Sequence, residues 1–263
     1  MSPLVELSKG QLAINIFEPS EYRGDAILIH GFTGSKEDFD YIGPLLAARG
    51  YRVFAADHRG IHESPHALDA SSYSMDSYAR DAIDIAKHFN LSSPHLFGHS
   101  YGGAVAQRAV LAEPERFASL TLFCSGPHAR ENLGISTLIL ENLVGKTMQE
   151  GWDQFAAPMY EGHKRRALME KRWLANDPRS ILAQAHDLST FTSVIEEVAA
   201  RKIASHVIYG ESDDAWPLAM QDQMAADLSA PVTVIKGAGH CPNEDQPEAT
   251  AKAIADFWDS RVN

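Results

Sequence analysis

Short apolar runs alternate along the chain with longer stretches in which apolar residues recur at helical spacing. Residues 4–8 and 11–17, joined at Lys9 and Gly10, predict a β-hairpin. Six later runs, at 25–30, 51–56, 95–98, 118–124, 206–210 and 232–235, are apolar at nearly every position. Such runs are typical of strands buried on both faces, as in a parallel sheet.

Helical periodicity fills the intervals between these runs. Ser74 can cap a helix over 76–89, and Pro247 can begin the last helix, whose apolar stripe ends at Trp258. Strands that alternate with helices predict the α/β class, with a mostly parallel central sheet covered by helices on both faces.

Residues 127–200 interrupt this alternation, because no strand-like run occurs among them. About 70 residues cannot form a bare loop in a compact domain, so we interpret this helical segment as an inserted lid. The core then comprises residues 1–126 and 201–263. Trp152 and Phe155 in the segment are candidate substrate contacts, although such aromatic residues serve packing as often as binding.

Composition restricts the class of protein. Lysine and arginine number 23 against 35 acidic residues, a formal charge of −12, and no basic stripe is present, which argues against a nucleic-acid partner. Lys164–Arg166 form the one basic cluster and predict a solvated helix face. No apolar stretch reaches the ~20 residues that span a bilayer, and no secretory signal is visible. We expect a soluble, cytoplasmic protein with reduced thiols at Cys124 and Cys241.

Residues 96–103 carry the most informative motif of the chain. A short apolar strand leads into the sequence Gly98-His99-Ser100-Tyr101-Gly102, and an alanine-rich helix follows. A glycine-flanked turn from strand to helix can expose a serine hydroxyl and orient it for attack. We therefore predict that Ser100 is a catalytic nucleophile.

Three further loops follow predicted strands. In the first, residues 30–35, the backbone N–H of Phe32 can join that of Tyr101 in an oxyanion hole. The second, residues 210–217, offers Asp213 as the acid, with Asp214 as its rival. The third, residues 237–240, offers His240 as the base, because its glycines leave the backbone free to bring the imidazole over the sheet.

Together, these signals resemble the α/β-hydrolase fold superfamily. The order Ser100, Asp213, His240 is the chain order of that family, and the likeness covers residues of about 4–125 and 200–262. The resemblance implies a serine nucleophile at the turn 98–102, the oxyanion loop at 30–32, the acid at 213 and the base at 240.

Residues 57–64 depart from the loop that the family usually carries. Ile61 stands where histidine is usual, and His62 stands where glycine is usual. The departure creates a spacing of four between His58, His62 and His66, which on a helix could hold a metal. Gly60 and Pro65 make a helix improbable there, so we predict no metal site. Cys241 beside His240 is interpreted as a packing residue.

The favoured function is hydrolysis of a carboxylic ester of a small, apolar substrate through an acyl-enzyme, with no cofactor. Trp216 lies three residues after Asp213 and is a further candidate substrate contact. Thioester, lactone or carbon–carbon bond cleavage uses the same triad and stays open. A ligand-binding receptor with little turnover is the alternative from another class. The sequence predicts neither the physiological substrate nor the oligomeric state.

Overall fold

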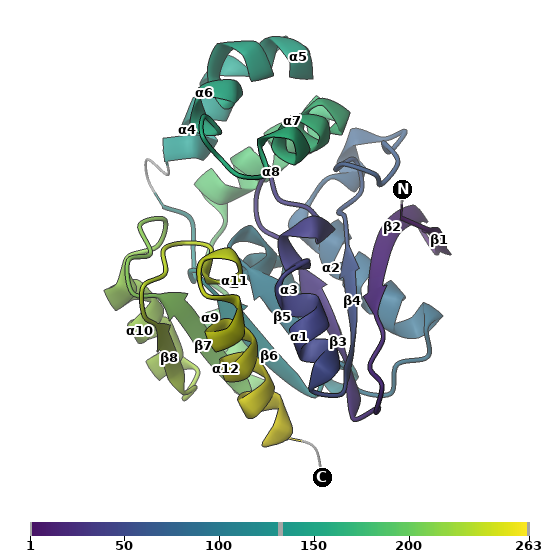
Figure 1. The fold of residues 1–263 in the computed structure, drawn as a ribbon, viewed down its shortest axis with the longest axis vertical. Coiled ribbons are helices and arrows are strands. Elements are labelled where there is room, and N and C mark those ends of the chain that lie inside the picture. The colour runs from purple at the N-terminus through teal and green to yellow at the C-terminus, as the bar shows by residue number, and fades with distance from the viewer. Residues whose placement is uncertain (1, 131–133, 262–263) are drawn as a thin grey trace.

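The computed structural model describes residues 2–130 and 134–261 (Figure 1). Their strands form one eight-stranded sheet in the order β1-β2-β4-β3-β5-β6-β7-β8. The strands are β1 Leu4–Leu7, β2 Gly10–Phe17, β3 Gly24–Ile29, β4 Tyr51–Ala56, β5 His95–His99, β6 Ser119–Phe123, β7 Ser205–Gly210 and β8 Val232–Ile235.

The sheet is parallel from β4 to β8, and the hairpin β1–β2 joins it antiparallel to β4. The four central strands β3, β5, β6 and β7 are buried along nearly their whole length, which explains their continuous apolar runs. The predicted α/β class and the mostly parallel sheet are confirmed.

Helices cover both faces of the sheet. On one face α1 packs against α12, and on the other α2, α3, α9 and α10 pack side by side (Figure 1). The bounds of these helices are α1 Ile42–Ala48, α2 Met75–His88, α3 Tyr101–Ala112, α9 Ile195–Ala200, α10 Leu218–Asp227 and α12 Pro247–Asp259. Short helical turns are η1 Lys36–Phe39, η2 Ala70–Ser72, η3 Pro114–Arg116 and α11 Pro242–Asp245. Within the described ranges, every helix is too short or too polar to cross a bilayer.

Between β6 and β7 the described residues form helices and the loops that join them, with no strand. The helices are α4 Gly134–Asn142, α5 Met148–Gly151, the π-helical turn η4 Trp152–Ala156, α6 Ala157–Met159, α7 Arg166–Ala175 and α8 Pro178–Thr190, followed by α9. Helices α4 to α8 gather at one end of the sheet (Figure 1, top), whereas α9 packs against α3 and α10.

The buried apolar side chains form two clusters. The larger one fills the space between the sheet and its helices. The second consists almost entirely of side chains from α4 to α8, and its one buried member from outside is Ile61. The helical segment therefore has a small apolar core of its own, held at the end of the sheet where β3, β5 and β8 finish.

Candidate active site

Ser100 occupies the sharp turn between β5 and α3. Its backbone angles, φ 54° and ψ −117°, are rare for a residue with a side chain. The turn is held by two hydrogen bonds: the Ser100 N–H donates to the Phe123 carbonyl at 2.9 Å, and the Ser125 hydroxyl donates to the Ser100 carbonyl at 2.7 Å. Neighbouring strand β6 thus supports the strained turn.

The two glycines of the turn are required by close backbone packing. A Cβ atom at Gly98 would lie 2.3 Å from the Gly102 carbonyl oxygen, and one at Gly102 would lie 2.4 Å from the carbonyl oxygen of Ile29. Both distances are far below van der Waals contact. The glycines therefore allow α3 to approach β3 and β5 closely enough to hold Ser100 at the sheet end.

The loop after β3 lies directly against Ser100. A Cβ atom at Gly31 would be only 3.1 Å from the Cβ of Ser100. The His58 N–H donates to His30 Nε2 at 3.1 Å, so His30 Nδ1 carries the ring proton and donates to the Gly31 carbonyl at 2.8 Å. Burial lowers the pKa of His30, in agreement with a neutral ring. These bonds fix the loop that carries Phe32.

The structure brings Asp213 and His240 together. The carboxylate Oδ1 of Asp213 lies 2.9 Å from His240 Nδ1, and Asp213 is buried. Burial by itself raises the pKa of Asp213, but hydrogen bonds and charge attraction from His240 outweigh it, so the net pKa is lowered. The rival Asp214 is exposed to solvent.

Gln221 in α10 is a residue of the site that sequence reasoning missed. Its amide donates to Asp213 Oδ2 at 2.9 Å and to the Trp216 carbonyl at 3.2 Å, and its side chain is fully buried. A glutamine one turn into a helix carries no motif. Its only signal is a polar residue on the buried side of the helix that follows the acid loop.

Ser100 and His240 line the same cavity, which has a volume of about 250 Å³. Among the described residues no hydrogen bond joins the Ser100 hydroxyl to His240. Other residues that line the cavity are Gly31, Phe32, Thr33, Gly34, Asp38, His99, Ile135, Tyr160, His163, Met169, Arg172, Leu188, Ala215, Cys241, Asn243 and Glu244.

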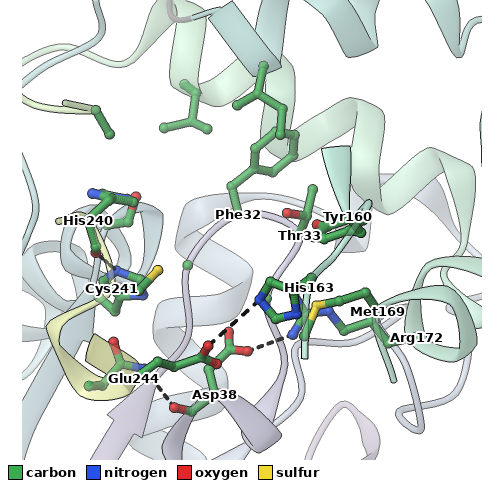
Figure 2. Close-up of a pocket in the computed structure, with 18 residues that line it drawn as sticks. Phe32, Thr33, Asp38, Tyr160, His163, Met169, Arg172, His240, Cys241 and Glu244 are labelled. Carbon is green, nitrogen blue, oxygen red and sulfur yellow. Dashed lines mark hydrogen bonds and ion pairs between the residues drawn. The ribbon is translucent and has the colours of Figure 1, made fainter. Parts of the chain in front are cut away.

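The cavity has two walls of different origin. Figure 2 shows His240 and Cys241 on one side, and Tyr160, Met169 and Arg172 of the helical segment on the other.

The two residues predicted to donate backbone N–H groups to an oxyanion, Tyr101 and Phe32, lie near Ser100. Tyr101 begins α3, so its N–H is among those without an intrahelical acceptor. Phe32 lines the cavity, and the loop before it touches Ser100.

Ion pairs hold the helical segment to the core beside the cavity. Arg172 of α7 donates to Asp38 of η1 at 2.6 Å; the side chain of Arg172 is 8% exposed and that of Asp38 is 14% exposed (Figure 2). Although burial raises the pKa of Asp38, the charge of Arg172 lowers it overall. Arg165 pairs with Asp40 at 2.7 Å and donates to the Glu37 carbonyl. The prediction of a solvated basic face at 164–166 is therefore wrong for Arg165.

The aromatic residues predicted as substrate contacts lie behind the cavity lining. Trp152 is buried and stacks on Tyr160, with ring centroids 5.8 Å apart. Phe155 packs edge-on against Trp173 at 5.5 Å. Trp216 is 1% exposed and lies so close to Gly126 that a Cβ there would be 2.1 Å from its ring. Of these aromatic groups, Tyr160 is the one that faces the cavity.

The unusual loop 57–64 serves the contact with the helical segment. Ile61 is buried in the second apolar cluster, and the N–H of His62 donates to the Asn176 side chain at 2.9 Å. His62 has φ 49°, the left-handed conformation that glycine adopts most easily. His58 contacts His30, whereas His66 approaches the Ala175 carbonyl, so the three histidines do not share one face.

Cys124 and Cys241 are free thiols. Burial raises the pKa of both, which keeps them protonated and weakly nucleophilic at neutral pH. Cys241 lines the cavity beside His240. This environment agrees with the interpretation of Cys241 as a packing residue.

Comparison with known proteins places the chain in a family. Residues 26–253 match the model of the alpha/beta hydrolase family. The chain is 29% identical to a pyrethroid hydrolase of Sphingobium wenxiniae, over 90% of this chain and 88% of that protein. It is 28% identical to a pimeloyl-[acyl-carrier protein] methyl ester esterase of Aeromonas hydrophila, over 89% and 94%.

Solved structures agree on the fold. The enol-lactonase from Burkholderia xenovorans LB400 superimposes with a TM-score of 0.83 at 16% identity, covering 98% of this chain and 100% of that one. With the family match, the parallel sheet and the strand–serine–helix turn, this shows that the chain belongs to the alpha/beta hydrolase family.

Proposed function

We propose that this hydrolase cleaves a carboxylic ester of a small, mainly apolar substrate through an acyl-enzyme on Ser100. One observation carries the proposal: a buried carboxylate, Asp213, is bonded at 2.9 Å to an imidazole, His240, that shares a cavity with a serine on a strained turn. A structural turn has no need of this costly backbone conformation.

The proposed reaction runs in two halves. His240 Nε2 takes the proton of the Ser100 hydroxyl while Oγ attacks the ester carbonyl, and the same proton then passes to the departing alcohol. Asp213 accepts a hydrogen bond from the Nδ1–H group of His240 and, remaining ionised, stabilises the imidazolium cation. The N–H groups of Phe32 and Tyr101 donate to the oxygen that becomes negative. In the second half, His240 takes a proton from a water molecule, which attacks the carbonyl of the acyl-enzyme. Ser100 regains its proton and the carboxylic acid is released.

The cavity supports a small substrate. Its volume of about 250 Å³ is below the ~300–1,000 Å³ of pockets for drug-sized ligands. Phe32, Ile135, Met169 and Leu188 give it a largely apolar lining. Since α4, α7 and α8 supply three of these side chains, we propose that the helical segment acts as a lid and selects the substrate.

The named relatives support ester chemistry. The pyrethroid hydrolase and the pimeloyl-[acyl-carrier protein] methyl ester esterase match the chain over nearly its full length. Lactones and thioesters are attacked through the same tetrahedral intermediate, so they belong to the same test. A panel of p-nitrophenyl esters, thioesters and lactones ranked by kcat/KM should place small apolar esters first.

The test of the nucleophile is Ser100→Ala. We expect kcat to fall by about 10⁴- to 10⁶-fold, because the attacking oxygen is lost while the fold is kept. A fluorophosphonate probe should label the unaltered protein at Ser100 and fail to label the variant. Ser189→Ala, which changes an exposed serine on α8, should behave like the unaltered protein. Retention of more than about a tenth of the esterase activity by Ser100→Ala would contradict the mechanism.

The fluorophosphonate probe also distinguishes the enzyme from the alternative function, a ligand-binding receptor with little turnover. Fast labelling of Ser100 supports an enzyme, whereas ligand binding without labelling supports the receptor.

A further inference from the structure

His99 lies between the nucleophile turn and the loop that carries the base. It is the last residue of β5 and directly precedes Ser100. Its side chain is buried, with 5% of the residue exposed, and it lines the cavity. Its Nε2 lies 2.9 Å from the backbone carbonyl oxygen of His240, and the two imidazole rings are 5.0 Å apart at 39°.

The partners of His99 define its tautomer. A carbonyl oxygen only accepts hydrogen bonds, so Nε2 carries the ring proton and donates it to His240. Nδ1 is then a buried acceptor, and it has no partner among the described residues. Burial, together with the neighbouring His240, lowers the pKa of His99 to about 4, which keeps the ring neutral and this donor in place at neutral pH.

The other edge of the ring lies against the oxyanion loop. A Cβ atom at Gly31 would be 3.3 Å from His99 Nδ1 and 3.1 Å from Ser100 Cβ. His99 therefore has three relations to the site. Its ring touches the loop after β3, its backbone directly precedes Ser100, and its Nε2–H donates to the backbone carbonyl of His240. Buried polar atoms without partners are rare, and they call for an explanation where they occur.

The loop around His240 has few other anchors at that residue. The Gly239 N–H donates to the Asp245 side chain, and the Ala238 carbonyl accepts from the Ser212 N–H. At His240 itself, the hydrogen bonds among the described residues are that of its side chain to Asp213 and that of its carbonyl to His99, beside the contact of its ring with the His99 ring. The second is the one that joins the base to the nucleophile turn.

We propose that His99 is a positioning residue, whose Nε2–H bond to the His240 backbone sets the approach of the base to Ser100. This inference rests on the proposed function, because it assigns His99 to the reaction that Ser100 and His240 carry out. Proton transfer depends steeply on the separation of donor and acceptor, so a loop displaced by an ångström slows the reaction.

The test compares two substitutions that differ in the donor. His99→Gln keeps an N–H donor near the position of Nε2, whereas His99→Phe keeps a ring of similar shape and removes the donor. We expect His99→Phe to lower kcat by about 10- to 100-fold with KM changed less than about twofold. His99→Gln should stay within about threefold of the unaltered protein. The fluorophosphonate labelling rate should fall in parallel with kcat.

A matched control exists at the other end of the same strand. His95 is also buried and bonds to the Ser119 hydroxyl, far from the cavity lining. His95→Phe should lower the melting temperature about as much as His99→Phe and leave kcat unchanged. If His99→Phe folds poorly, His99→Met serves instead, because methionine matches glutamine in length and lacks the donor.

Two outcomes would overturn the inference. Equal kcat values for His99→Phe and the unaltered protein would show that the bond does not position the base, and equal losses in the Gln and Phe variants would show that the donor is irrelevant. Failure of the proposed function is distinct, since the unaltered protein would then not be labelled at Ser100. The downfield proton resonance of the His240–Asp213 bond gives a second readout, and it should broaden in His99→Phe.

Discussion

The carboxylate of Asp213 is held by several hydrogen bonds, most of them to one oxygen. Asp213 Oδ1 accepts from His240 Nδ1 at 2.9 Å and from the backbone N–H groups of Ala215 at 3.0 Å and Trp216 at 3.4 Å. Gln221 occupies Oδ2. With both oxygens bonded, the carboxylate cannot rotate freely, and it holds the imidazole in one tautomer.

The two adjacent aspartates give a direct test at the scale of a residue. Asp213→Asn should lower kcat by about 10⁴-fold, because an amide that donates toward Nδ1 favours the wrong tautomer of His240. Asp214→Asn should change kcat by less than about twofold, since Asp214 is exposed. Both are measured with a p-nitrophenyl ester at neutral pH. A larger loss in Asp214→Asn would reverse the assignment of the acid.

Residues of the site differ in how far the sequence predicts them. Ser100, Asp213 and His240 follow predicted strands and lie within three residues of a glycine, so a local pattern marks each one. Gln221, Asp38 and Arg172 come from helices without a motif and meet the site only through tertiary contacts. The sequence does not show whether the side chains of Trp152 and Phe155 face the cavity or the interior of the helical segment. Their contacts with Tyr160 and Trp173 decide this, and hydrophobic periodicity does not predict those contacts.

Among the elements, the strands were the most predictable. Each predicted strand agrees with an observed one to within a residue or two. In β3, β5, β6 and β7 the reason is burial on both faces, which demands continuous apolar runs. The edge strand β8 exposes Val232 and Val234, so the prediction of burial on both faces is wrong for that strand. Two predicted helix starts are confirmed: Ser74 caps α2 through the Ser77 N–H, and Pro247 begins α12. The ion pairs that attach α7 to η1 were not visible, since they join residues more than 100 positions apart.

The pair of Arg172 and Asp38 is the element-scale test. Arg172→Gln should lower the free energy of unfolding by about 2–4 kcal/mol, somewhat less than for a fully buried pair, because it leaves the partly buried carboxylate of Asp38 without its cation. The double variant Asp38→Asn/Arg172→Gln should lose less than the sum of the single changes. Urea unfolding followed by circular dichroism measures both. Strict additivity would show that the two side chains do not stabilise each other.

For the whole molecule, buried histidines couple stability to pH. Burial lowers the pKa of His95, His99 and His206 to about 4, and it lowers that of His30 and His58 as well. The unfolded chain binds these protons near pH 6.5, whereas the folded chain does not. Stability from these residues is therefore complete above about pH 6.5 and is lost as the pH falls toward 4. Asp81 has the opposite effect: burial raises its pKa to about 6, so between pH 6 and 4 the folded chain binds one proton that the unfolded chain does not, and this proton favours folding.

His206→Gln tests the coupling far from the cavity. Glutamine can keep the bond that His206 Nε2 makes with Thr233, but it does not titrate. The fall in unfolding free energy between pH 6.5 and 4.5 should be shallower by up to about 1.4 kcal/mol per pH unit, the value of one proton. His88→Gln, an exposed control on α2, should keep the original slope. Identical slopes for all three proteins would contradict the assignment.

The division of the buried apolar side chains into two clusters also affects how the cavity can change by mutation. The side chain of Phe32 packs against both clusters, and so stands at the joint between the sheet and the helical segment. Mutations that reshape the smaller cluster alter one wall of the cavity and leave the strands beneath the serine turn untouched. Substitutions among a few dozen residues can therefore reshape the cavity without displacing the turn that holds Ser100.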